Sequence, residues 1–219
     1  AAGAHFKKHP WEHIFGDNPT LVYGNFIDPR VLVEKRKYGE MPDHAKLTAV
    51  ANDYLDDYNA VSKKKMDLVL FMFAIEHLAR IARVIQQPLG NALMVGIGGS
   101  GRKSVATLAA SMCEQTLFEI ELSKTYGMFD WREDLKKVFN LAGAAAGGPT
   151  TFLFSDTQIV KEGFVEDINN ILNTGAVPNL FLPDERQMII DDLERTAANN
   201  MVGGIPGQPT GNEVFEYFL

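Results

Sequence analysis

A glycine-rich segment directly after a short apolar run constrains the fold of this chain more than any other feature. The run Ala92–Val95 predicts a buried strand, and the segment Gly96–Gly101 then leads into a predicted helix. Glycines let the backbone turn tightly and turn its N–H groups inward, and a helix N-terminus adds partial positive charge. The segment therefore predicts a cradle for a phosphate chain, and with it a nucleotide-binding domain.

Two nucleotide-binding patterns compete for this segment. Gly96, Gly98 and Gly101 satisfy G-x-G-x-x-G, which binds dinucleotides and expects an acidic residue about 20 positions further on. Glu119 and Glu121 lie at about that distance, at the end of a second predicted strand. This pattern predicts a domain that binds a cofactor of the NAD type.

The competing pattern is the P-loop, G-x-x-x-x-G-K-[ST], whose lysine reaches the phosphates and whose hydroxyl holds Mg²⁺. In that register Gly96 and Gly101 fit, but Arg102 takes the lysine position and Lys103 the hydroxyl position. A shift by one residue fits Lys103 and Ser104 and loses both glycines. From the loop alone the two patterns are equal, and a glycine turn that serves only packing is a third interpretation. The candidate nucleotide-binding residues are Gly96, Gly98, Gly99, Ser100, Gly101, Arg102, Lys103 and Ser104.

A third predicted strand, Thr150–Phe154, favours the ATPase interpretation. It consists of bulky residues and is followed by Ser155 and Asp156. In an ATPase an acid at this place holds Mg²⁺ or orients the attacking water, whereas a dinucleotide enzyme does not need it. Asp156 is therefore the candidate catalytic residue, and its alternative is an ordinary solvated carboxylate at the end of a strand.

The order of elements predicts an α/β fold with a mostly parallel sheet covered on both faces, because strands alternate with helices. Residues 1–42 contain many Pro and Gly residues and predict an irregular arm packed on the domain formed by 43–219. Leu117–Leu122 is the second predicted strand. The predicted helix starts are Asp43, Asp67, Asp130 (in a capping box with Glu133), Asp184 and Asn212.

Composition excludes several classes of protein. A net charge of −7 argues against a nucleic-acid-binding surface, and no apolar stretch is long enough to span a membrane. The single cysteine, Cys113, excludes a disulfide within the chain and fits a reducing compartment. We therefore expect a soluble intracellular protein with neither a nucleic acid nor a membrane as partner.

Beyond these patterns, the sequence resembles dynein heavy chains, and within them the fourth AAA+ module of the motor ring in its axonemal type. The resemblance covers nearly all of the chain and is more specific than either glycine pattern. It is carried by Gln87–Leu93, Val95–Arg102, Trp131–Leu135, Phe152–Ile159, Phe164–Asn170 and Gly175–Phe181.

This resemblance implies the P-loop NTPase (AAA+) fold, a three-layer α/β/α sandwich with a parallel sheet in the strand order 5-1-4-3-2. The fourth strand, which carries the sensor residue, would follow Leu219, so the resemblance implies a large subdomain truncated before that strand. The helical subdomain and the arginine finger of the neighbouring module would also lie outside the chain.

The resemblance also implies ATP or ADP as ligand, with Mg²⁺ as candidate ion. Arg102 stands where nucleotide-binding relatives have lysine, Ser155 at the position of the Mg²⁺-binding carboxylate, and Asp156 at that of the catalytic glutamate. The candidate Mg²⁺ ligands are Ser104, Ser155 and Asp156, and the candidate adenine-side residues are Leu21, Val22 and Tyr23.

These departures favour a regulatory module, in which hydrolysis is slow or absent, within an ATP-hydrolysing microtubule motor of the cytoskeleton. Its expected partners are the neighbouring AAA+ modules of the same heavy chain, with microtubules bound only through the rest of the motor, in the axoneme of a cilium or flagellum. Two alternatives remain: a dinucleotide-dependent oxidoreductase that uses Glu119 or Glu121, and a structural ring module without nucleotide.

Overall fold

The computed structural model of the chain describes residues 21–200 and 210–219, with side chains to residue 194 and again from 210. The chain divides into two units, Ala1–Glu114 and Gln115–Leu219, which are described separately here. Residues 1–20 of the predicted N-terminal arm lie outside the described residues.

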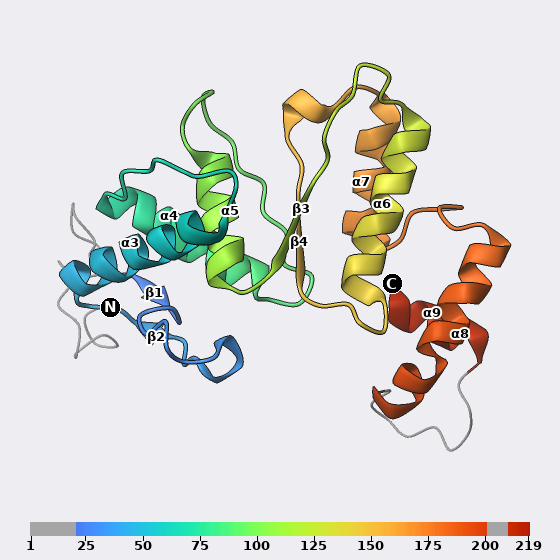
Figure 1. Cartoon of the computed structure of the whole chain (residues 1–219), viewed down its shortest axis with the longest axis horizontal. Coiled ribbons are helices and arrows are strands. Elements are labelled where there is room, and N and C mark those ends of the chain that lie inside the picture. Colours follow the sequence, from blue (N-terminus) through green and yellow to red (C-terminus); the bar gives the residue numbers. More distant parts are fainter. Residues whose placement is uncertain (1–20, 201–209) are drawn as a thin grey trace, which may run out of the picture. The chain divides into compact units, whose positions relative to one another are not determined.

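The first unit consists of a small hairpin and three helices (Figure 1). The strands of the hairpin are antiparallel, with Tyr23 opposite Glu40 and Gly24 opposite Gly39. The hairpin packs on α4, and the helices α3, α4 and α5 pack on one another. The elements are β1 (Tyr23–Gly24), the 3₁₀ helix η1 (Val33–Lys35), β2 (Gly39–Glu40), α3 (His44–Val61), α4 (Met72–Ile85) and α5 (Arg102–Met112).

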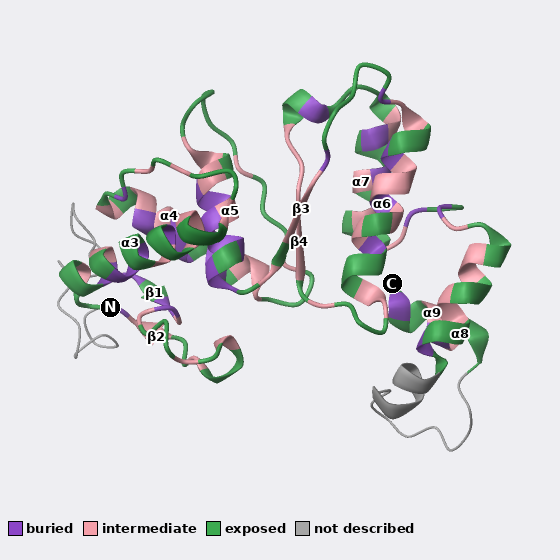
Figure 2. Cartoon of the chain, in the orientation of Figure 1, coloured by how far each residue is buried: buried purple, intermediate pink, exposed green. Residues whose placement is uncertain are grey.

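The core of the first unit forms where the apolar stripes of its three helices meet. Figure 2 shows buried residues along the facing sides of α3, α4 and α5. Each large apolar side chain that is fully buried there contributes about 1.5–3 kcal/mol to the stability of the fold. The fully buried large side chains of this unit are Phe26, Leu47, Ile75, Leu78, Leu108 and Met112.

The predicted starts of α3 and α4 have different outcomes. Asp43 caps α3 as predicted, since its carboxylate accepts a hydrogen bond of 2.9 Å from the Lys46 N–H. The predicted start of the next helix at Asp67 is wrong, because α4 begins at Met72. The side chain of Asn59 pairs with both backbone groups of Met66, at 2.8 and 2.7 Å, and so fixes the connection directly before the predicted start.

The second unit contains two parallel strands and a group of helices. The pair β3–β4 aligns Thr116 with Thr150 and Glu119 with Leu153, so the fold is mixed α/β with parallel strands, as predicted. The helix α6 packs on β4, α7 and α9, and α8 packs on α9. The elements are β3 (Thr116–Glu119), α6 (Met128–Gly143), β4 (Thr150–Leu153), the 3₁₀ helix η2 (Asp156–Gln158), α7 (Glu162–Thr174), α8 (Pro183–Asn200) and α9 (Gly211–Phe218).

The first predicted strand is absent: Ala92–Val95 forms no strand in the described part of the chain. Leu93, Val95 and Ile97 are 92%, 85% and 82% exposed, so this run is not buried either. An isolated strand gains no cross-strand hydrogen bonds. The family strand order puts a further strand between the first and the third, and no described strand occupies that position.

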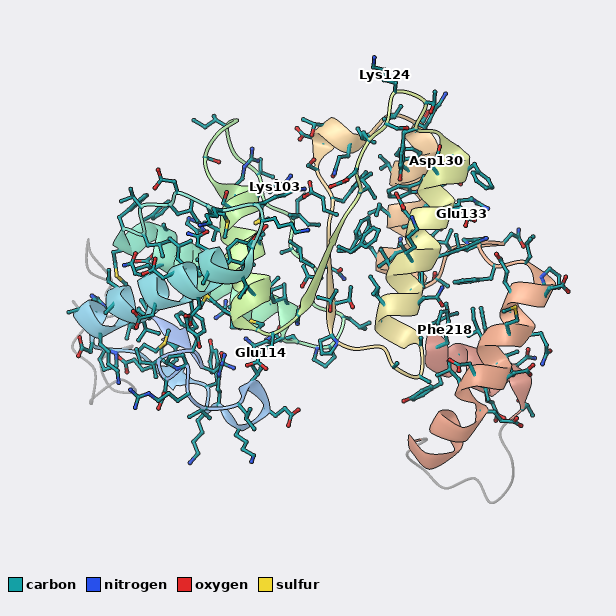
Figure 3. All side chains as sticks on the ribbon, viewed as in Figure 1. Lys103, Glu114, Lys124, Asp130, Glu133 and Phe218 are labelled. Carbon is teal, nitrogen blue, oxygen red and sulfur yellow. The ribbon has the colours of Figure 1, made fainter. Side chains whose placement is uncertain are left out.

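The predicted cap of α6 at Asp130 is wrong, because Gly127 is the N-cap of this helix. The helix α6 begins at Met128, and the Asp130 carboxylate accepts a hydrogen bond of 2.9 Å from the Gly127 N–H, so Asp130 lies inside the first turn. Figure 3 shows Asp130 and Glu133 on this end of α6. Glu133 instead accepts a hydrogen bond of 2.9 Å from Lys136. Lys136 also donates to Glu185 at 2.7 Å, which joins α6 to α8, and these two hydrogen bonds raise the pKa of Lys136.

The start of α9 is set by Thr210 rather than by Asn212. The hydroxyl of Thr210 accepts from the Glu213 N–H at 3.4 Å, and the Glu213 carboxylate accepts from the Thr210 N–H at 2.7 Å. This reciprocal pair is a capping box. The side chain of Asn212 accepts a hydrogen bond of 2.8 Å from Arg186 instead, so it joins α9 to α8.

The core of the second unit is organised around Trp131. Its ring lies stacked on Phe164 with the centroids 4.5 Å apart. Its indole N–H donates a 2.9 Å hydrogen bond to the carboxylate of Asp167, which is 5% exposed. The guanidinium of Arg132 lies 3.9 Å from the other oxygen of that carboxylate. A buried charge needs such partners, so Trp131 and Arg132 on α6 fix the position of α7.

We expect the substitution Trp131→Phe to lower the free energy of unfolding by about 1–3 kcal/mol, because it leaves the buried Asp167 carboxylate without its indole donor. Urea unfolding followed by circular dichroism measures this loss. The matched variant Asp167→Asn keeps an acceptor oxygen for the indole and should cost less. An unfolding midpoint of Trp131→Phe equal to that of the original chain would contradict this role.

Candidate functional site

The glycine loop enters α5 through two residues in the left-handed conformation. Gly99 and Gly101 both have φ of +76°, where residues with a side chain are strained. Gly101 is the N-cap of α5, and no side chain caps this helix end. The first N–H groups of a helix have no partner within the helix, and they favour an anion. Figure 3 shows Lys103 at this end of α5.

The side chain of Arg102 donates hydrogen bonds to backbone carbonyls of its own glycine loop. Its guanidinium donates hydrogen bonds of 3.2 Å to the carbonyl of Met94 and 3.1 Å to that of Ile97. A methyl group on Gly96 would lie 3.3 Å from Cδ of Arg102, so a side chain at this position would require Arg102 to shift by a few tenths of an ångström. Arg102, at the lysine position of the P-loop pattern, therefore stabilises the conformation of the loop to which it belongs.

The other candidate residues of the loop differ in how exposed they are. Gly98, Ser100 and Lys103 are exposed, and Ser104 is half-buried on the first turn of α5. All candidates from Gly96 to Ser104 thus lie together in the first unit. Their contact with a phosphate stays a prediction.

Ser155 and Asp156 follow β4 in the second unit. The Ser155 hydroxyl lies 2.9 Å from the Thr157 hydroxyl and donates to the Gln158 side-chain oxygen at 3.1 Å. Asp156 is exposed at the start of η2, and one of its carboxylate oxygens accepts a 2.9 Å hydrogen bond from the Thr157 N–H. The structure thus places the two candidates side by side, and their roles stay predictions.

Gln158 is a residue of this segment that the motif patterns did not single out. It is 7% exposed, and its amide oxygen accepts from the Ser155 N–H at 2.8 Å. Its amide nitrogen donates to the Ile120 carbonyl at 2.9 Å and to the Glu119 carboxylate at 3.3 Å. The side chain therefore joins the carboxyl ends of β3 and β4. Its only sequence signal was the S-x-x-Q spacing from Ser155 to Gln158, which is typical of a capping box.

The predicted adenine-side residues lie at the hairpin of the first unit. Val22 is buried in the core, and Leu21 is half-buried. The ring of Tyr23 lies stacked on Tyr38, with the centroids 6.3 Å apart. The side chain of Val22 is therefore occupied by packing, and the adenine role of the three residues stays a prediction.

Among the described residues, no three or more His, Cys, Asp or Glu side chains are grouped so that they could hold a metal ion. No helix in the described ranges is long and apolar enough to cross a membrane.

Comparison with known proteins identifies what the sequence is similar to. Residues 66–219 match the family described as P-loop containing dynein motor region D4. The chain is 48% identical over 173 residues to human dynein axonemal heavy chain 1, an alignment that covers 79% of this chain and 4% of the relative. It is 47% identical over 211 residues to mouse dynein axonemal heavy chain 3, covering 96% of this chain and 5% of the relative.

A third relative, human dynein axonemal heavy chain 6, is 46% identical over 204 residues, covering 92% of this chain and 5% of the relative. The chain thus spans only 4–5% of the length of the curated relatives that it matches.

We expect Gln158→Leu to increase hydrogen exchange at the Ser155 amide at least about tenfold, because about 1.4 kcal/mol of lost protection corresponds to a factor of ten. Exchange resolved by mass spectrometry or NMR measures it. The matched control is Asn173→Leu, which removes an exposed side-chain amide that donates to the Asn169 carbonyl. An unchanged Ser155 amide in Gln158→Leu would show that Gln158 does not restrain this segment.

Proposed function

The chain belongs to the dynein heavy chain family, as its P-loop containing motor region D4, and from this premise we propose that it binds ATP or ADP through the loop Gly96–Ser104. The observation that carries the proposal is the loop geometry: two left-handed glycines lead into a helix N-terminus that no side chain caps. Backbone N–H groups in this arrangement favour phosphate groups whatever the nearby side chains are.

Arg102 then has two competing sets of partners. In the structure it donates to the carbonyls of Met94 and Ile97, and a bound phosphate would compete with them for the guanidinium. The carbonyls are neutral acceptors, whereas a phosphate is an anion whose oxygens pair with both arms of the guanidinium, so the exchange favours the nucleotide. The planar guanidinium cannot replace the point charge of a lysine without a change in geometry, so we expect weaker binding than in a P-loop with lysine.

Hydrolysis by this module is slow or absent in our proposal. Ser155 occupies the Mg²⁺-carboxylate position of the family pattern, and its neutral hydroxyl supplies no charge to a metal ion. Its hydroxyl is also already bonded to Gln158 and near Thr157. Asp156, at the catalytic position, is one methylene shorter than glutamate. Of the three candidate Mg²⁺ ligands Ser104, Ser155 and Asp156, only the last has a charge.

In this proposal, nucleotide binding by the module changes the conformation of the motor ring of which it is part. Residues 43–219 form part of its large nucleotide-binding subdomain. Its partners are the neighbouring AAA+ modules of the same heavy chain, and microtubules are contacted only by other parts of the motor. Its location is the axoneme, which the names of the similar heavy chains suggest.

A structural module without nucleotide is the second candidate, and the self-binding of Arg102 favours it. In that case the guanidinium replaces the nucleotide as the group that keeps the loop closed. The dinucleotide-dependent oxidoreductase is not favoured, because the matching family is a dynein motor region. Of the two glutamates that it could use for ribose, Glu119 and Glu121, the first accepts a hydrogen bond from Gln158.

Calorimetric titration with ATP, ADP and NADH, each with and without Mg²⁺, tests the proposal. We expect the adenine nucleotides ATP and ADP to bind, and Arg102→Ala to weaken them at least about tenfold through the loss of a charge-assisted bond. Arg102→Lys supplies the lysine of the P-loop pattern and should bind the nucleotides at least as tightly as the original chain. The matched control Lys124→Ala removes an exposed lysine from the loop between β3 and α6, which Figure 3 shows, and should have little effect.

Each other result of the titration contradicts a definite part of the proposal. Equal affinity of Arg102→Ala and the original chain would exclude Arg102 as a phosphate ligand. A folded chain that binds no nucleotide would favour the structural module. Binding of NADH without ATP or ADP would revive the dinucleotide interpretation.

We expect ATP hydrolysis at this module to be slower than about 1 s⁻¹, the lower end of ordinary enzyme turnover, when the neighbouring module is supplied. The double substitution Ser155→Asp with Asp156→Glu restores the charge at the metal position and the length at the catalytic one, and should raise the rate about tenfold or more. Release of inorganic phosphate measures both. A rate above that limit in the original sequence would contradict the regulatory role.

A further inference from the structure

A cavity of about 220 Å³ lies in the first unit, where the hairpin meets the C-terminal half of α4. The small side chains of Ala79 and Ala82 on α4 leave this space open, and Phe26 also lines it. Ligand pockets for cofactors usually measure about 300–1,000 Å³, so this cavity suits a group the size of one side chain rather than a nucleotide.

One wall of the cavity is a pair of side-chain amides. Asn25 donates to the oxygen of Gln86 at 2.6 Å, and Gln86 donates back to the oxygen of Asn25 at 3.3 Å. Gln86 donates as well to the Ala82 carbonyl at 3.0 Å. Both amide oxygens are therefore occupied by this pair, and the second N–H of Asn25 has no acceptor among the described residues.

The cavity is also lined by Arg83, a cation that is not paired with a carboxylate of the described residues. Arg83 donates a hydrogen bond of 3.3 Å to the Tyr38 hydroxyl, and within the described ranges no carboxylate pairs with it. By contrast Arg80, one turn earlier on α4, pairs with Glu76 at 3.4 Å. Because Tyr38 accepts from Arg83, its own O–H can donate to a further group. The residues that line the cavity include neither Asp nor Glu.

We propose that this cavity binds a carboxylate group. Arg83 pairs with its oxygens, the Tyr38 hydroxyl and the second N–H of Asn25 donate to it, and Ala79 and Ala82 contact its methylene groups. The lining offers donors and one guanidinium, whose fork matches the two oxygens of a carboxylate. A single cation and this volume suit one carboxylate better than a polyphosphate. The proposal does not depend on nucleotide binding by the glycine loop.

A carboxylate can come from a free small acid or from an acidic side chain of a polypeptide, and two probes distinguish them. The first is glutarate, and the second is the peptide acetyl-Ala-Ala-Glu-Ala-Ala-amide, with Gln in place of Glu as its neutral match. Calorimetric titration of the 219-residue chain gives the affinities. We expect the Glu peptide to bind at least about tenfold more tightly than the Gln peptide, since a charge-assisted bond is lost.

The variants then assign the binding to the cavity. Arg83→Gln should lower the affinity for the Glu peptide at least about tenfold. Arg83→Lys keeps the charge without the planar guanidinium and should lower this affinity less. Tyr38→Phe should weaken it to a smaller extent. The matched control Arg80→Gln removes an exposed arginine from the same helix outside the cavity and should not change the affinity. Circular dichroism confirms that each variant is folded.

The results separate clearly. Binding of both probes that depends on Arg83 supports a site open to free acids, and binding of the Glu peptide alone supports an acidic segment of a polypeptide partner. If neither probe binds to the folded chain, or if the Gln peptide binds equally well, the proposal is wrong. Equal losses in Arg83→Gln and Arg80→Gln would also overturn it, because they would indicate attraction by surface charge alone.

Discussion

Backbone groups that lie outside helices and strands need hydrogen-bond partners, and at three connections of this chain a side chain supplies them. Asn59 pairs with both backbone groups of Met66 and so fixes the connection between α3 and α4. Gln158 does the same between the ends of β3 and β4, through the Ile120 carbonyl and the Ser155 N–H. Arg102 binds two carbonyls of the glycine loop. In each case a side chain supplies the partner that no strand or helix offers.

The same requirement links the structure of the glycine loop to its proposed function. A guanidinium that satisfies two loop carbonyls gains about 1.5–3 kcal/mol from each hydrogen bond to a charged donor. A phosphate must offer Arg102 more than these contacts, and it can, since both partners are then charged. Under the proposed function, nucleotide binding therefore exchanges one set of Arg102 partners for another.

The sequence predicted what depends on local patterns and on burial. The helices α3 and α8 begin near their predicted starts at Asp43 and Asp184, and Asp43 caps the first of them. The predictions failed where the local conformation depends on a partner outside the segment itself. The predicted start at Asp67 missed the bonds between Asn59 and Met66, which fix the connection before α4, and Ala92–Val95 lacks a neighbouring strand. Gln158 and the cavity at Arg83 were missed because each combines residues that are far apart in the sequence.

Binding and hydrolysis make different demands on a P-loop protein, and under our proposal this chain departs from the family pattern mainly in the residues for hydrolysis. Binding relies on backbone N–H groups, which Gly99 and Gly101 provide through their conformation and which Arg102 leaves intact. Hydrolysis relies on carboxylates that hold Mg²⁺ and position water. Ser155 has no charge, and Gln158 holds its hydroxyl and its N–H. A sequence can therefore lose hydrolysis through a change such as that at Ser155 while the phosphate cradle, which needs glycine and a helix end, persists.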